Sequence, residues 1–139
     1  MIATDTHPDP IALETALNRE PFLKKLFGWD FLLGELNVMF VQNHYAPIRI
    51  RGEWWRFESK AGVRFLAPPI TEAIRLDIAS NGFAGPVSPE AAGIIFTLGG
   101  LVLLMEQGFT DQTPFNSHRD LLAWSRLHPE ADTIRNALD

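Results

Sequence analysis

The chain has 139 residues, 46% of them hydrophobic and 21% charged, which is enough for a single globular domain with a sizeable core, and we expect one domain over residues 1–139. It contains no cysteine, which excludes a disulfide framework, a thiolate metal site and a cysteine nucleophile. The formal net charge is −5, from 12 Lys and Arg against 17 Asp and Glu. This balance lacks both the clustered basic charge of non-specific nucleic-acid binding and the large acidic excess of a DNA mimic.

The first third of the chain predicts three helices, at residues 10–19, 21–28 and 30–43. The second begins with Pro21 and ends at Gly28, and both residue types are typical of those helix positions. The third has a wide apolar face behind an Asp30 cap, so we expect it to be largely buried. The residues of this face are Phe31, Leu32, Leu36, Met39 and Phe40.

Apolar and polar residues alternate in the middle of the chain, the pattern of strands with one wet face. The alternation covers residues 53–60 and 73–79, and the segment between them, 63–68, is rich in β-forming side chains. Gly62 suits a short hairpin turn between the first two segments. We therefore expect an antiparallel meander of three strands, or of four if residues 48–50 join it.

The glycine-rich stretch "SNGFAGPVSPEAAGIIFTLGGLVLLMEQ" has three interpretations: a phosphate loop, a membrane span or a core helix. It contains no Walker pattern and no G-x-G-x-x-G. The uncharged run within it, residues 91–105, has 15 residues, fewer than the roughly 20 that a transmembrane helix needs. Ser88 as N-cap, Pro89 at the first helical position and Glu90 near the positive end of the helix dipole predict instead a buried central helix near residues 88–107. Small residues along it would let neighbouring elements approach closely.

Two further helices are expected at residues 113–127 and 129–138, separated because the residue before Pro129 disfavours the helical conformation. The predicted fold class is therefore α+β, a meander of three or four strands packed against five to six helices.

Catalytic chemistry has no positive support in the sequence. The four histidines form no H-E-x-x-H or other close metal-ligand spacing, and no G-x-S-x-G elbow is present. We predict no catalytic residue, no cofactor and no bound metal, and a metal-dependent hydrolase is the weakest of the alternatives.

Two features are candidates for a functional role. Glu35 lies within an apolar helix, where a buried carboxylate must find a base or hydrogen-bond donors; bracing the fold is the more economical interpretation. Trp54 is expected to point outward, because its neighbour Trp55 takes the inward position, and an exposed tryptophan beside arginines is typical of an interface anchor or of a stacking platform for a base. The alternative is that Trp54 packs under residues 46–47. The candidate interaction surface comprises Trp54, Arg49, Arg51, Arg56 and Arg64.

Five fragments together resemble the ArdB/KlcA antirestriction family. They are "FLLGELNVMF", "WRF", "FLAP", "NGFAGPVSPEAAGIIFTL" and "HPEADTIRNALD", in the order of the family and over most of residues 22–139. Glu35 matches the glutamate of the family pattern. Two loops depart from it: "RGEW" stands where relatives have a Gly-Gly pair, and "SKAG" stands where they have a Ser-Asn-Gly-Gly turn.

The resemblance implies a small cytoplasmic protein of plasmids, phages and other mobile elements that relieves restriction by type I restriction-modification enzymes. It also implies a partner in the host restriction complex or an associated factor, with no DNA mimicry and no agreed catalytic residues. The shortness of the uncharged run at residues 91–105 predicts no membrane partner. The absence of a basic and then apolar leader in "MIATDTHPDPIALE" agrees with a cytoplasmic location. The alternative function is a weak nucleic-acid-binding accessory protein that uses the arginines of the meander.

Overall fold

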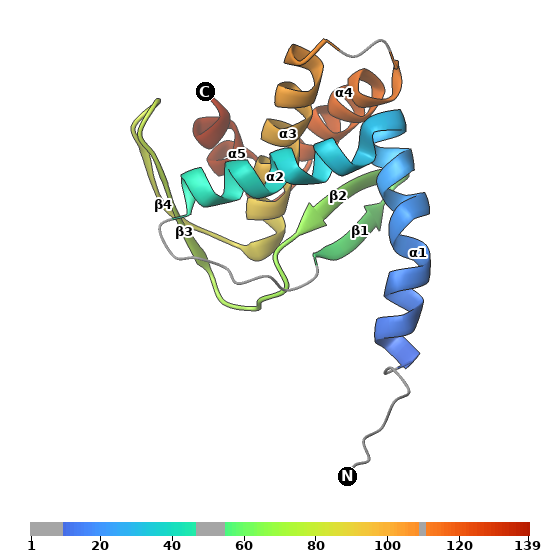
Figure 1. The fold of residues 1–139 in the computed structure, drawn as a ribbon. Helices are drawn as coiled ribbons and strands as arrows, with labels where there is room; N and C mark the ends of the chain where they lie inside the picture. The colour runs from blue at the N-terminus through green and yellow to red at the C-terminus, as the bar shows by residue number, and fades with distance from the viewer. Residues whose placement is uncertain (1–9, 47–54, 109–110) are drawn as a thin grey trace.

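The computed structural model describes the backbone of residues 10–46, 55–108 and 111–139, and the side chains of these ranges from residue 19 onward. The described residues form five α-helices, one 3-10 helix and two antiparallel hairpins, an α+β arrangement (Figure 1). In chain order the elements are α1 (Pro10–Phe27), η1 (Gly28–Asp30), α2 (Phe31–Tyr45), β1 (Arg56–Lys60), β2 (Val63–Ala67), β3 (Ile74–Ile78), β4 (Phe83–Val87), α3 (Pro89–Glu106), α4 (Thr113–Ser125) and α5 (Ala131–Leu138).

The first two predicted helices are in fact one. α1 runs without a break through Pro21, although the sequence predicts that Pro21 starts a second helix. Proline has no N–H group, so the carbonyl one turn before Pro21 receives no helical hydrogen bond from it. Pro21 is exposed, so water can reach this carbonyl instead. The predicted end near Gly28 is correct, because the chain passes there into η1 with Gly28 at a φ of +84°.

The expected meander is wrong, because the strands form two separate hairpins. β1 pairs with β2 through the predicted tight turn, in which Gly62 has a φ of +78°. The next strand, β3, does not continue this sheet but pairs with β4. Pro68 and Pro69 follow β2 directly, and two consecutive residues without an N–H group cannot extend a ladder. The possible strand at residues 48–50 lies outside the described residues.

The strand β4 was missed because its sequence, "FAGPV", contains two residues that weaken strand predictions. Gly82 has a φ of +76° in the turn that leads into β4, and the Asn81 side chain accepts a hydrogen bond from the Phe83 N–H at 2.9 Å. Pro86 is exposed opposite Arg75. An edge strand tolerates such a proline, because the missing N–H does not have to serve a second neighbour.

Helix α3 is the centre of the core, as predicted. All residues from Ala91 to Leu98 are buried, and α3 contacts α2, α4, α5, β2 and β3 (Figure 1). By length and composition alone this helix could cross a membrane. However, the other elements cover this helix, as is typical of the core helix of a globular domain.

Close contacts of α3 depend on two of its glycines. A Cβ at Gly93 would lie 2.5 Å from the Leu66 carbonyl oxygen, and a Cβ at Gly100 would lie 2.5 Å from a methyl group of Val38. One turn after Gly93, the Thr97 hydroxyl accepts a hydrogen bond from the Leu66 N–H at 3.0 Å and donates to the Leu66 carbonyl at 3.2 Å. The small residues thus let the backbone of β2 and the side chains of α2 lie directly against α3.

The orientation of α2 corrects another expectation. Four of its five predicted core residues are exposed: Leu32, Leu36, Met39 and Phe40. The side that faces the protein instead carries the small or polar residues Gly34, Glu35, Asn37 and Gln42, together with Val38 and Val41. Gly34 allows the Phe27 ring to pack against the helix backbone, and the Asn37 amide donates to Gln107 at 3.0 Å. Close packing therefore decides which side is buried, and the larger apolar side faces outward.

Candidate functional site

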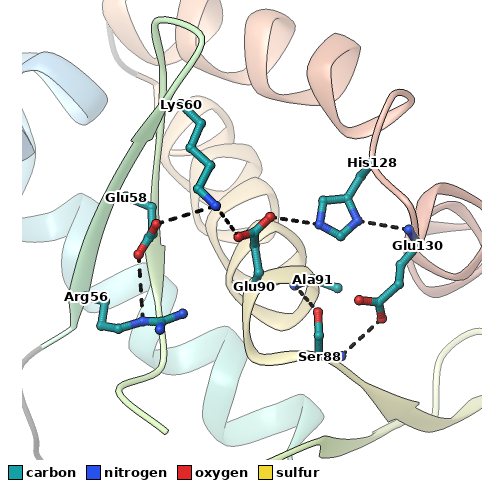
Figure 2. Close-up of polar contacts among 8 residues, drawn as sticks. All are labelled: Arg56, Glu58, Lys60, Ser88, Glu90, Ala91, His128 and Glu130. Carbon is teal, nitrogen blue, oxygen red and sulfur yellow. Dashed lines mark hydrogen bonds and ion pairs between the residues drawn. The ribbon is translucent and has the colours of Figure 1, made fainter. Parts of the chain in front are cut away.

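Polar side chains gather around the first turn of α3, where the chain enters the core. The Ser88 hydroxyl accepts a hydrogen bond from the Ala91 N–H at 3.0 Å, so Ser88 is the N-cap, and Pro89 follows at the first helical position. The Ser88 N–H donates in turn to the Glu130 carboxylate at 3.1 Å. The start of α3 is thereby tied to the turn between α4 and α5 (Figure 2).

Glu90 joins that turn to the first hairpin. One carboxylate oxygen accepts a hydrogen bond from Lys60 Nζ at 2.6 Å, and the other lies 2.9 Å from His128 Nε2 (Figure 2). Partial burial disfavours the charged carboxylate, but the hydrogen bonds from Lys60 and His128 outweigh it and hold the pKa of Glu90 below its ordinary value. The hydrogen bond to Glu90 raises the pKa of Lys60. The Glu90 carboxylate is therefore ionised at neutral pH and engaged on both oxygens.

Both ring nitrogens of His128 are occupied. Nδ1 accepts a hydrogen bond from the Glu130 N–H at 2.9 Å, which places the proton of the neutral ring on Nε2, where it is donated to Glu90. The side chain is 6% exposed, and its ring lies edge-on to Trp124 with centroids 6.1 Å apart. A general base needs one nitrogen open to the substrate, so this geometry orients His128 as a structural link.

The charges of this cluster alternate in sign along its length. Arg56 and Lys60 flank Glu58 at 3.8 and 4.0 Å, and Lys60 continues to Glu90 (Figure 2). Within the described residues no group of three or more histidine and acidic side chains is placed to hold a metal ion. The arrangement braces β1 against α3 and the α4–α5 turn.

The candidate arginines do not form one surface among the described residues. Arg56 and Arg64 belong to paired strands, but the register places Arg56 opposite Ala67 and Arg64 opposite Ser59, which assigns the two side chains to opposite faces of the hairpin. Arg56 pairs with Glu58, whereas Arg64 lines a small polar cavity of about 200 Å³. Arg49, Arg51 and Trp54 lie outside the described residues. Trp55 is buried.

Glu35 is buried and has the basic partner that its position requires. Its carboxylate forms a salt bridge and hydrogen bond with Arg19 of α1. The guanidinium also lies 5.8 Å from the centroid of the Phe57 ring, which stacks on Phe22 at 4.8 Å. The contacts of Glu35 thus join α2 to α1 and, through Arg19, to β1, which is a bracing role.

Two features of this molecule were missed by the sequence patterns. Lys60, His128 and Glu130 received no role, although "SPE" and "HPE" repeat a Pro-Glu pair at the two places that meet in the structure. The second is the outward face of α2, which we define as Leu32, Leu36, Met39 and Phe40 with the preceding Trp29. Its apolar period was recognised, but its exposure was not.

Comparisons with known proteins converge on one family. A family model described as "Antirestriction protein" matches residues 49–139. Two proteins of Escherichia coli named antirestriction protein KlcA are similar: one is 29% identical over 98% of this chain and 99% of its own length, and the other is 34% identical over 95% and 96%. The putative antirestriction protein YubI of Escherichia coli strain K12 is 32% identical over 88% of this chain and 90% of its own length.

A solved structure shares the fold. It aligns with a TM-score of 0.75 and 30% sequence identity, over 88% of this chain and 89% of the other. That work is described as showing that the KlcA and ArdB proteins have a novel fold and antirestriction activity against type I DNA restriction systems in vivo but not in vitro.

Proposed function

We propose that this chain, which belongs to the antirestriction protein family, relieves type I DNA restriction by contacting a protein of the restricting host, without catalysis and without imitating DNA. The observation that carries this proposal is its likeness, over 88% of the chain, to proteins that act against type I systems in vivo but not in vitro. An activity that requires the cell depends on a component that the purified reaction lacks. We take that component to be a cytoplasmic host protein, either the restriction complex in its cellular state or a factor associated with it.

The described surface supports a contact mechanism over DNA mimicry. A mimic needs unpaired acidic groups spaced like phosphates, whereas several carboxylates here are engaged by bases. Glu90 is held by Lys60, Glu35 by Arg19, and Glu58 lies between Arg56 and Lys60. The net charge of −5 is modest for 139 residues.

The polar cluster likewise supports a structural role over catalysis. Its histidine has both nitrogens engaged, and its glutamate has both oxygens engaged. The hairpin does not support the alternative of nucleic-acid binding through Arg56 and Arg64, because it places these two side chains on opposite faces.

Two measurements test the mechanism. Glu90→Gln keeps the shape of the side chain and removes its charge, so a contact mechanism predicts that antirestriction, measured by plating of unmodified phage on a type I restricting host, persists at equal levels of folded protein. Loss of activity in the folded variant would assign the carboxylate a direct role. Fluorescence anisotropy with labelled duplex and single-stranded DNA at low salt should show no binding; a salt-dependent rise would favour the nucleic-acid alternative.

A further inference from the structure

The outward face of α2 is a large apolar surface. Leu32, Leu36, Met39 and Phe40 are 65%, 58%, 41% and 53% exposed, and Trp29 beside them is 86% exposed. These fractions together equal about three fully exposed large side chains, or roughly 600 Å² at about 200 Å² each. That area is at the upper end of the largest apolar patch on ordinary monomers, roughly 300–600 Å², and is most of the roughly 800 Å² that each partner contributes to a standard interface.

The spacing of this face is that of a helix-pairing seam. Within α2 the exposed residues Leu32, Leu36, Met39 and Asn43 follow one another at intervals of four, three and four, and Trp29 precedes them in η1. These are the a and d positions of two heptads. In this pattern the side chains of a second helix fit between those of the first. α2 crosses α3 with no described helix or strand over its outer side (Figure 1). Within α2 the one acidic side chain is the buried Glu35, and the helix contains no lysine or arginine, so the α2 residues of this face carry no charge.

A groove continues this surface at Phe40. It has a volume of about 600 Å³ and lies between α2, α3, α4 and the end of α5, with largely apolar walls that include Val102, Leu122 and Leu138. Its charged lining is acidic, from Glu106 and Asp139, and among the described residues no lysine or arginine lines it. Two histidines, His44 and His118, also line the groove, and burial lowers the pKa of His118, which therefore adds no charge at neutral pH.

We propose that the outward face of α2 and this groove together bind an amphipathic helix of a partner protein, one that has an apolar seam and carries lysine or arginine at the end lying over Glu106 and Asp139. The proposal rests on the proposed contact mechanism and names the chemistry of the partner. The acidic charge of the groove indicates which kind of helix fits it. α2 contains no lysine or arginine, so the α2 of a second copy would offer neither of these side chains to the acidic groove. A partner with basic residues supplies the missing charge at the end of the apolar contact.

Binding of two designed peptides tests this chemistry. Both are 18-residue helices with leucine at a and d, fluorescein-labelled; one carries lysine and the other glutamate at the positions flanking the seam. Anisotropy should show at least about tenfold tighter binding of the lysine peptide, equivalent to about 1.4 kcal/mol. Leu36→Asp should abolish this binding, whereas Leu127→Asp, at an exposed leucine that does not line the groove, should leave it unchanged.

A charge-swapped pair separates a local effect from the net charge of the protein. Glu106→Lys should remove most of the preference for lysine, and Asp132→Lys, which changes the net charge equally but does not line this groove, should preserve it. Equal binding of the two peptides, or equal effects of the two substitutions, would overturn the proposal. So would a dimer in sedimentation that dissociates with Leu36→Asp, since the face would then belong to a second copy.

Phage plating distinguishes failure of this inference from failure of the function. Leu36→Asp introduces a charge at an exposed position, and circular dichroism with thermal melting checks that the variant is folded. If the native chain relieves restriction, folded Leu36→Asp should lose the relief and Leu127→Asp should keep it. Full relief by both variants would remove the docking surface and leave the antirestriction function standing. No relief by the native chain would count against the function itself.

Discussion

Replacing Gly93 by alanine tests the packing that places α3 in the core. The new Cβ would lie 2.5 Å from the Leu66 carbonyl oxygen and 2.7 Å from the Ala67 Cα, whereas ordinary contact begins at 3.4 Å. Both atoms are backbone, so α3 and β2 must move apart by close to 1 Å, which also strains the two hydrogen bonds of Thr97 to Leu66.

The expected change in the free energy of unfolding is the sum of opposing contributions. Overpacking costs about 1–3 kcal/mol, and weakening two buried hydrogen bonds adds about 1–2 kcal/mol. Alanine recovers about 1 kcal/mol of helix propensity. We expect a net loss of about 2 kcal/mol in the free energy of unfolding, which lowers the urea midpoint by about 1 M for an m-value near 2 kcal/mol/M.

Gly99→Ala is the matched control within the same helix. It gains the same propensity, but its Cβ would meet the Val41 methyl groups at 3.0 and 3.1 Å, and a side chain can shift where a backbone cannot. Its stability should stay within about 1 kcal/mol of the native protein. The reasoning is refuted if Gly93→Ala unfolds at the same urea concentration as Gly99→Ala, or at a higher one.

Three other experiments test the polar contacts. Ser88→Ala removes the N-cap of α3 and should cost about 1 kcal/mol in urea unfolding; an unchanged midpoint would dismiss the cap. Arg19→Met leaves the buried Glu35 without its base and should lower the melting temperature. Adding Glu35→Leu should restore much of the loss, because breaking a buried ion pair costs more stability than replacing both partners by apolar residues. A double variant less stable than the single one would contradict this. The pKa of Glu90 is lowered in the folded state from its ordinary value of 4.5. The contribution of Glu90 to stability is therefore present above that value and is lost as the pH falls through the lowered pKa. Glu90→Gln should therefore flatten the fall in melting temperature over that acidic range, and an identical profile would show that Glu90 does not contribute.

Local signals were sufficient for α3 but not for the pairing of the strands. Ser88 and Pro89 mark the start of the helix by their own backbone chemistry, so they could be recognised without a partner. The pairing of β3 with β4, by contrast, depends on the prolines after β2 and on a strand whose own sequence contains glycine and proline. Alternation in the sequence predicts a strand but does not identify its neighbour.

The outward face of α2 shows a second limit. Periodicity identifies two sides of a helix, and the larger apolar side is normally assigned to the core. Here Gly34 gives close access to the Phe27 ring, and Val38 packs on Gly100, so the narrower side fits the core better. The shape of the neighbouring helices decides this, and it is not encoded within residues 31–45.

The polar contacts could be predicted only in part. The need of Glu35 for a base follows from its apolar surroundings, but the partner, Arg19, is 16 residues away. Lys60 and His128 are 30 and 38 residues from Glu90, and only the folded chain brings them together.

The plating of unmodified phage on a type I restricting host, with and without this protein, tests the central claim most directly. An isogenic host without the restriction enzyme gives the reference for unrestricted plating. We predict that the protein raises plating on the restricting host toward this reference and leaves plating on the reference host unchanged. Equal plating on the restricting host with and without folded, soluble protein would contradict the antirestriction function.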